Sequence, residues 1–195
     1  MKVIAWDVDD VLNDLMYFWF CQKWLLEHSG CSIKYEDLVE NPPHKILKIR
    51  KEEYLNSLDE FRLSGLYSKM QPISEIRNWF IKYGKFFRHI VVTAVPLKSC
   101  HISAEWVMKH FGEWIRTFHF VPSKRSGENI VLYDKTKQGF LKWFNKVDVF
   151  IDDNEDNINE CESIGIKCVL FPRPWNKSKL SIEEVLLQLN RMLGM

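Results

Sequence analysis

Short apolar segments recur along the chain, and each one ends at or next to a polar residue or a proline. They cover residues 2–6, 89–93, 118–121, 147–151 and 167–171. Helical periodicity is found in the intervening and following segments, over residues 99–112, 136–145, 154–163 and 180–193. Strands that alternate with helices in this way predict right-handed βαβ units. We therefore expect an α/β fold with a mostly parallel sheet and helices on both faces.

One long interval interrupts the alternation. Residues 14–84 contain helical patterns but no convincing strand, and these patterns cover Asn13–Glu27, Lys51–Arg62 and Ile73–Tyr83. The interval is too long for a single crossover helix, so it predicts an insertion that covers the end of the first strand as a lid. We expect an α/β core formed by residues 1–13 and 85–195 and a helical cap formed by residues 14–84.

Charge and cysteine content narrow the class of protein. The 195 residues include 27 Lys and Arg and 26 Asp and Glu, so the formal charge is +1 and there is no global field to attract a nucleic-acid polymer or an anionic membrane. The five cysteines form no C-x-x-C pair, which favours reduced thiols, and no apolar stretch has the length of a membrane span. We expect a soluble, cytoplasmic protein, and the sequence leaves its oligomeric state open.

Polar side chains stand at the ends of three expected strands. Asp7 and Asp9 follow the first strand, Thr93 ends the second, and Asp152 follows a later one. In an open parallel sheet the carboxyl ends of the strands meet at one edge, where ligands bind. Carboxylates ~4 Å apart repel by ~4 kcal/mol at an effective dielectric constant of 20, and a divalent cation reverses this effect. The carboxylates therefore predict a Mg²⁺ site, because Mg²⁺ prefers oxygen ligands and a phosphate.

These residue types suit phosphoryl transfer. Asp7 is the candidate nucleophile, and Asp9 is the candidate general acid and base that serves the leaving group and then water. The charge of the transferring group requires a metal, a hydroxyl or N–H donor and a lysine. Thr93 is the expected hydroxyl donor. Lys135, just before the helix that leads to the Asp152 strand, is the leading candidate for the lysine, ahead of Lys98 and Lys124.

These residues, taken in order, resemble the haloacid dehalogenase (HAD) superfamily. The motif D-x-D-x-[TV]-[LV] matches residues 7–12, and Thr93, Lys135 and the acidic run 152–156 match the later motifs. The resemblance implies a Rossmann-like core with a cap inserted after the first motif. It implies Mg²⁺ bound by the Asp7 carboxylate, the Asp9 backbone carbonyl and the Asp152 carboxylate. It also implies a phosphatase, since an Asp two positions after the nucleophile marks that branch.

Within the superfamily, the first motif followed by a helical cap, together with D-K-T ahead of I-D-D, looks like the 5′(3′)-deoxyribonucleotidase group. The chain differs from that group at Leu15, Ala94 and Asn154, where the group often has an aromatic residue, Ser and Arg. We expect a magnesium-dependent phosphatase that hydrolyses a small phosphomonoester through an aspartyl-phosphate. The substrate would be a small phosphorylated metabolite or a nucleotide.

Several alternatives stay open at the level of sequence. A nucleotidase specific for (deoxy)nucleoside monophosphates is one, and a non-catalytic magnesium-binding domain of the same fold is another. A phospho-receiver domain would need its acceptor Asp on a middle strand, whereas Asp7 follows the first. Asp153 and Asp156 could contact the metal through water or could be acids at a helix N-terminus.

Overall fold

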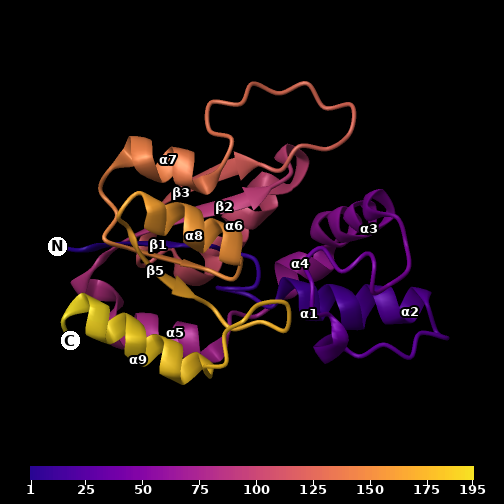
Figure 1. The fold of residues 1–195 in the computed structure, drawn as a ribbon, viewed down its shortest axis with the longest axis horizontal. Helices are drawn as coiled ribbons and strands as arrows, with labels where there is room; N and C mark the ends of the chain where they lie inside the picture. The colour runs from indigo at the N-terminus through magenta and orange to yellow at the C-terminus, as the bar shows by residue number, and fades with distance from the viewer.

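The computed structural model describes residues 1–195 and contains a five-stranded parallel sheet (Figure 1). The strands are β1 (Val3–Trp6), β2 (Arg88–Val95), β3 (Ile115–Pro122), β4 (Val149–Asp152) and β5 (Lys167–Leu170). Their order in the sheet is β3-β2-β1-β4-β5, and every neighbouring pair is parallel. The expected α/β fold is confirmed, because each strand contains or overlaps an apolar segment identified in the sequence.

The helices also follow the periodic segments. They are α1 (Leu15–Trp19), α2 (Leu25–Glu27), α3 (Lys51–Leu63), α4 (Gly65–Lys69), α5 (Ser74–Tyr83), α6 (Cys100–Phe111), α7 (Lys137–Phe144), α8 (Glu155–Ser163) and α9 (Ile182–Leu193). A π-helical turn, Phe20–Trp24, joins α1 to α2. The short α4 had no clear signal in the sequence, since five residues are too few to show a period.

Helices cover both faces of the sheet. Side chains along β1 alternate, so that Ile4 and Trp6 enter the larger apolar cluster while Val3 and Ala5 enter the smaller one. The larger cluster includes buried residues of α5, α6 and α9, and the smaller includes those of α7 and α8. The core therefore has three layers, and the central strand is buried on both sides.

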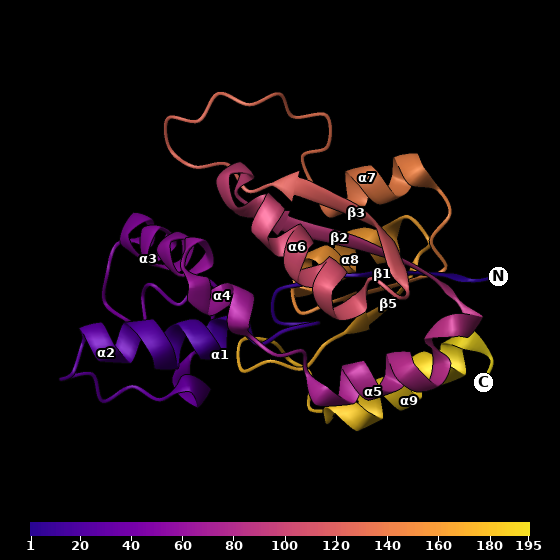
Figure 2. The ribbon, with the colours of Figure 1, turned by 180° about the vertical axis from the view of Figure 1, so that it is seen from behind.

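Helices α1 to α4 form a separate group beyond the end of the sheet, on the right in Figure 1 and on the left in Figure 2. The chain leaves the core after β1 and returns before α5. These two crossings lie together, because the Ile73 amide donates a hydrogen bond of 3.0 Å to the Leu12 carbonyl. The inserted segment thus leaves and re-enters the core at neighbouring points, and we propose that it forms the cap.

Helix α5 packs with the core, although the sequence-based boundary placed it in the cap. The Trp79 indole donates a hydrogen bond of 2.7 Å to Asn190 of α9. The rings of Trp79 and Phe80 lie 5.6 and 4.9 Å from that of Trp6 in β1. The apolar face of α5 therefore covers the sheet. Periodicity in the sequence shows that a helix has an apolar face, but not whether that face packs on a sheet or on another cap helix. We therefore propose that the cap ends before Ser74.

The topology places the candidate residues at one edge. Strand β1 lies between β2 and β4, so the connections after β1 and β4 leave from neighbouring strand ends. Ligands bind at such a switch point in open α/β sheets.

No helix of the protein combines the length and the apolar character needed to cross a membrane.

Candidate active site

Asp7 is the first residue after β1, and its position is set by the sheet and by a tight turn. Its amide donates to the Ile151 carbonyl of β4 at 3.0 Å, which extends the β1–β4 pairing by one residue. Its carboxylate accepts a 2.7 Å hydrogen bond from the Val8 amide. Beyond it, Asp10 has a left-handed backbone conformation (φ 65°), and the turn closes with a 2.8 Å bond from the Leu12 amide to the Val8 carbonyl.

A buried lysine joins the two strand ends, and it is Lys137 rather than Lys135. The Lys137 Nζ lies 2.6 Å from an oxygen of Asp7 and 2.6 Å from an oxygen of Asp152. Lys135 is exposed and forms no ion pair with either carboxylate. Thr136 between them is the N-cap of α7, so Lys137 is the first helical residue and shares a face with the buried residues Phe140 and Leu141. The signal in the sequence is the i, i+3, i+4 spacing of Lys137, Phe140 and Leu141, which places Lys137 on the apolar face of the helix.

Asp152 ends β4 and is held by the N-cap residue and the first turn of helix α8. The Asn154 amide donates to Asp152 Oδ1 at 2.9 Å, and the Asn157 side chain donates to both carboxylate oxygens at 3.1 and 3.2 Å. Asn154 also caps α8 by accepting bonds from the Asp156 and Asn157 amides. Asp152 is thereby fixed in orientation and fully buried.

Thr93 lies two residues beyond Val91, which pairs with Trp6 in the β1–β2 register. Asp7 is one residue beyond Trp6, so Thr93, which lies two residues before the end of β2 and not at its end as expected, stands beside the end of β1. Thr93 is buried, and its hydroxyl is among the influences that lower the pKa of Asp7. The structure therefore brings Thr93, Asp7, Lys137 and Asp152 together.

Asp9 faces the cap. Arg62 of α3 approaches Asp9 Oδ2 through Nη2 at 2.9 Å, and the Tyr67 hydroxyl donates to Oδ1 at 2.8 Å. Asn13 adds a longer hydrogen bond of 3.3 Å to Oδ1. The orientation of Asp9 thus depends on the cap, and neither Arg62 nor Tyr67 was identified from the sequence, because spacing does not show which cap residues reach the core.

Three carboxylates are close enough to share a cation. One oxygen each from Asp7, Asp152 and Asp153 lie within 4.8 Å of one another, and all three residues are buried. Asp153, expected at most as an indirect ligand, is therefore part of the cluster. The Asp9 backbone carbonyl stays a predicted ligand. Asp156 is exposed in the first turn of α8 and is not in this cluster.

The buried carboxylates at this end of the sheet, called the acidic floor below, outnumber the positive charges near them, which favours a bound cation. Buried carboxylates of Asp7, Asp10, Asp152 and Asp153 outnumber the two nearby cations, Lys137 and Arg173. Such an excess of buried charge is costly unless a metal neutralises it. The chemistry of the donor set, all carboxylate oxygens, fits Mg²⁺.

Burial changes the protonation behaviour of these groups. It raises the pKa of Asp7 to about 6, although the Lys137 ammonium group lowers it. Burial also raises the pKa of Asp10 to about 7 against the effect of Arg173, and burial with the neighbouring Asp152 raises the pKa of Asp153 well above its ordinary value. Burial alone would lower the pKa of Lys137, but Asp152 and Asp7 together raise it above its usual range.

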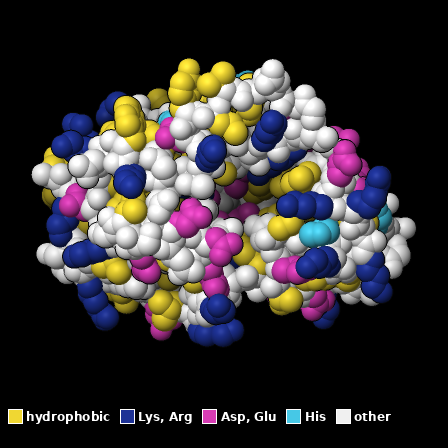
Figure 3. All heavy atoms as spheres, turned by 45° about the horizontal axis from the view of Figure 1, so that its top comes forward, with side chains coloured by type: hydrophobic (Ala, Val, Ile, Leu, Met, Phe, Trp, Pro, Cys, Tyr) yellow, Lys and Arg dark blue, Asp and Glu magenta, His cyan; other side chains and the backbone are white.

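A cavity of about 280 Å³ opens over these residues. Its floor includes Asp7, Asp9, Lys137 and Asp152, together with Asp153. The other lining residues include apolar cap side chains and two arginines: Leu15, Met16, Tyr54, Leu55, Leu58, Arg62 and Arg125. Figure 3 shows this hollow between the two halves of the molecule, with acidic side chains inside it and Lys or Arg side chains near its rim. With a cation bound among the carboxylates, the cavity would suit an anionic group at the floor and an apolar group against the cap.

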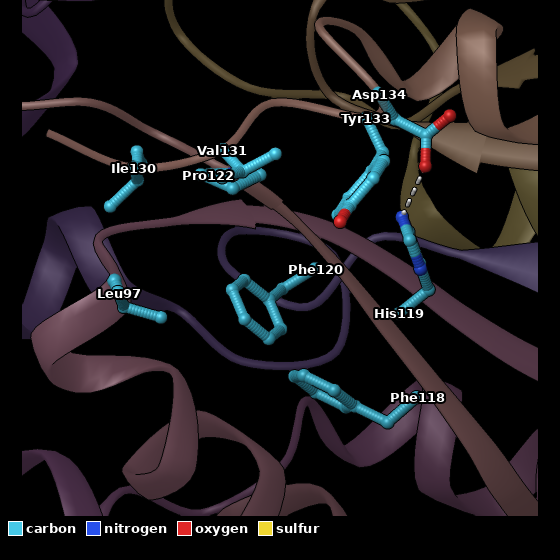
Figure 4. Close-up of a pocket in the computed structure, with 9 residues that line it drawn as sticks. All are labelled: Leu97, Phe118, His119, Phe120, Pro122, Ile130, Val131, Tyr133 and Asp134. Atoms are coloured by element: carbon cyan, nitrogen blue, oxygen red, sulfur yellow. Dashed lines mark ion pairs between the residues drawn. The ribbon is translucent and has the colours of Figure 1, made fainter.

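A second cavity, of about 390 Å³, lies at the outer strand β3 and the segment that follows it (Figure 4). Its walls are mostly apolar and aromatic, including Phe118, Phe120 and Tyr133, and His119 faces Asp134 across 3.4 Å. None of the clustered carboxylates lines it. It is therefore not the site that the strand ends form.

No family model matches the chain, and no curated protein matches it in sequence. Solved structures do match it. A hydrolase from Streptococcus pneumoniae TIGR4 aligns with a TM-score of 0.61 at 13% identity, and the alignment covers 100% of both chains. A HAD-superfamily hydrolase from Ehrlichia chaffeensis aligns with a TM-score of 0.54 at 12% identity over 99% of both.

The protein YfnB of Bacillus subtilis, described as a HAD hydrolase and bound to magnesium, aligns with a TM-score of 0.62 at 12% identity, over 100% of this chain and 99% of that one. The chain has the fold of the haloacid dehalogenase superfamily. At these identities the similarity to the HAD hydrolases concerns the fold, and what the site does is argued from its own residues.

Proposed function

We propose that the protein is a magnesium-dependent phosphatase of the HAD type that hydrolyses a small phosphomonoester. The observation that supports this most directly is the arrangement of Lys137 between Asp7 and Asp152, 2.6 Å from each, beneath a cavity that also contains Asp9. A nucleophilic carboxylate, a fixed cation and a second carboxyl group are the parts that phosphoryl transfer through an aspartyl ester requires.

In the first step a carboxylate oxygen of Asp7 attacks phosphorus. The bond from phosphorus to the leaving oxygen breaks, and Asp9 donates a proton to that oxygen, so that an alcohol departs and an aspartyl-phosphate remains on Asp7. In the second step Asp9 removes a proton from water. The water oxygen attacks phosphorus, the bond to Asp7 breaks, and inorganic phosphate is released.

Other residues stabilise the charge of the transferring group. Lys137 supplies a positive charge next to Asp7, and the Thr93 hydroxyl supplies a hydrogen-bond donor for a phosphoryl oxygen. Asp7, Asp152 and Asp153 would hold Mg²⁺, with the Asp9 carbonyl as a further ligand. When bound, Mg²⁺ neutralises the carboxylates and polarises the phosphoryl group.

The apolar cap side chains that line the cavity favour a leaving group with an apolar face. Leu15, Met16, Tyr54 and Leu58 line the same cavity as the carboxylates. An aromatic ring and aliphatic side chains can pack on a nucleobase. A nucleotidase acting on (deoxy)nucleoside monophosphates is therefore the second candidate. It predicts a higher kcat/KM for deoxynucleoside monophosphates than for p-nitrophenyl phosphate, and equal values would exclude it.

The phosphatase proposal predicts that Asp7→Asn abolishes turnover. The amide cannot act as the nucleophile, so we expect less than roughly 3% of wild-type activity on p-nitrophenyl phosphate with Mg²⁺. The matched control is Asp37→Asn, an exposed acid in the cap, which should retain wild-type activity. Release of p-nitrophenol that is insensitive to EDTA, or that survives in Asp7→Asn, would contradict the proposal. A wild-type protein that binds Mg²⁺ without turnover would favour the non-catalytic alternative.

A further inference from the structure

The segment Arg173–Asn176, which follows β5, contacts both loops that carry the acidic floor. On the side of the β1 loop, the Arg173 guanidinium donates to the Asp10 carbonyl at 2.7 Å and to the Asn13 carbonyl at 3.5 Å. It also pairs with the Asp14 carboxylate at 2.6 Å, and its side chain is only 8% exposed. Arg173 therefore ties the turn after Asp7 to the end of β5.

On the side of the β4 loop, the same segment holds Asp153. The Trp175 indole N–H donates to Asp153 Oδ2 at 2.7 Å. The Asn176 side-chain amide donates to the Asp153 carbonyl at 2.8 Å and to the Phe171 carbonyl at 2.7 Å. Both the main chain and the side chain of Asp153 are thus bonded to adjacent residues of one loop.

Asp153 differs from the other two clustered carboxylates in its partners. Asp7 and Asp152 share the Lys137 ammonium group, whereas Asp153 forms no ion pair. Its side chain is buried, and the Trp175 N–H is its hydrogen-bond donor. One carboxylate oxygen is therefore fixed by a neutral donor, and the charge of the group is left uncompensated. A buried carboxylate in this state is stable only if it is protonated or if a cation lies nearby, and a bound divalent cation would supply that charge.

We propose that Trp175 is a positioning residue for the divalent-cation site, which orients Asp153 through its indole N–H and leaves the second oxygen of that carboxylate available to the metal. The inference rests on the magnesium site of the proposed function. Partners that hydrogen-bond to a metal-ligating carboxylate set its direction, and their loss typically weakens metal binding 10–100-fold. Trp175 acts through Asp153 and is not itself a ligand.

The test is Trp175→Phe, which removes the N–H and keeps an aromatic ring. Binding of Mn²⁺, which prefers the same oxygen ligands, is measured without substrate through the loss of the free-ion EPR signal. We expect the dissociation constant to rise ~10-fold or more, while the melting temperature in EDTA stays within a few degrees of wild type. Trp143→Phe is the matched control, because Trp143 is 77% exposed on α7, and it should bind Mn²⁺ as wild type does.

A double-mutant comparison separates positioning from a general structural effect. In an Asp153→Asn background, Trp175→Phe should change the dissociation constant less than about twofold, since the group it orients has lost its charge. An equal effect in both backgrounds, or a folded Trp175→Phe protein that binds within twofold of wild type, overturns the inference. Where Trp175→Phe does not fold, Asn176→Ala decides: a weakening of several-fold supports the inference and no change overturns it.

Failure of the inference and failure of the proposed function give different results. A wild-type protein that binds Mn²⁺ with the predicted dependence on Trp175, yet hydrolyses no phosphomonoester, contradicts the phosphatase and supports the role of Trp175. An active, magnesium-dependent enzyme whose metal affinity is the same with and without the Trp175 indole contradicts only the role of Trp175 and leaves the phosphatase proposal standing. A wild-type protein that binds neither Mn²⁺ nor Mg²⁺ overturns both.

Discussion

Lys135 and Lys137 lie on either side of Thr136, and their environments are opposite. Lys135 precedes the N-cap and is exposed, whereas Lys137 opens α7 and is buried with its ammonium group against Asp7 and Asp152. A buried ammonium between two carboxylates offsets their repulsion and stabilises a charged substrate group. The choice between the two lysines depends on which face of the first helical turn meets the sheet.

The two lysines can be compared directly by substitution. We expect Lys137→Met to lower kcat on p-nitrophenyl phosphate ~100-fold or more, because a fixed charge next to the transferring group is lost. Lys135→Met should leave kcat within about twofold of wild type, since its side chain is exposed. Melting temperatures show whether Lys137→Met is folded. A larger loss of kcat in Lys135→Met than in Lys137→Met would reverse the assignment made from the structure.

At the scale of elements, helix α3 connects the cap to the core through one buried acid. Asp59 is 1% exposed and accepts two hydrogen bonds from Arg125, from Nε at 2.7 Å and from Nη2 at 2.8 Å. Lys98 lies 3.3 Å away and Arg62, one turn along the same helix, 3.4 Å. Since Arg125 and Lys98 belong to the core and Arg62 contacts Asp9, this cluster holds the cap over the site.

Asp59→Asn should therefore loosen the cap. Removal of one partner from a buried ion pair costs roughly 3–5 kcal/mol, because the remaining charges lose their counter-ion. We expect faster hydrogen exchange in peptides from α3 and a lower kcat through the loss of the Arg62–Asp9 contact. The neighbouring Glu60→Gln is the control, since its pair with Lys23 is 67% exposed on the Glu60 side and should contribute less than about 1 kcal/mol. Equal exchange in the two variants would argue against the role of Asp59.

At the scale of the whole molecule, a neutral histidine links the sheet to the helices beneath it. His89 of β2 accepts a 3.1 Å hydrogen bond from the Trp6 indole at Nδ1, so its Nε2 carries the proton and lies 2.9 Å from the Gly84 carbonyl. The rings of Trp79 and Phe80 of α5 also lie near it, at 6.0 and 4.7 Å. Protonation of Nδ1 would place its N–H against the Trp6 indole N–H, so that two donors face each other without an acceptor.

Burial lowers the pKa of His89 from 6.5 to about 4. The unfolded chain therefore binds more protons than the folded protein between these values, so the contribution of His89 to stability is present above pH 6.5 and is lost as the pH falls towards 4. The difference between the two pKa values corresponds to a loss of about 3 kcal/mol in the free energy of unfolding. Urea unfolding at pH 7 and pH 4.5 should show a larger fall in the free energy of unfolding for wild type than for His89→Gln. The exposed His101→Gln should behave as wild type, and identical pH dependence in all three proteins would contradict the assignment.

Much of this protein is determined by its sequence alone. The parallel core could be predicted because buried strands and amphipathic helices leave local periodicities, and Asp7, Thr93 and Asp152 could be placed together because parallel strands end at one edge of a sheet. The tertiary structure decided which residues meet. Lys137, not Lys135, contacts Asp7, and Asp153 lies with the clustered carboxylates. Arg62 pairs with Asp9, and α5 packs against α9. Each of these depends on which faces of a helix or loop meet across long sequence separations, and packing of the whole chain sets those contacts.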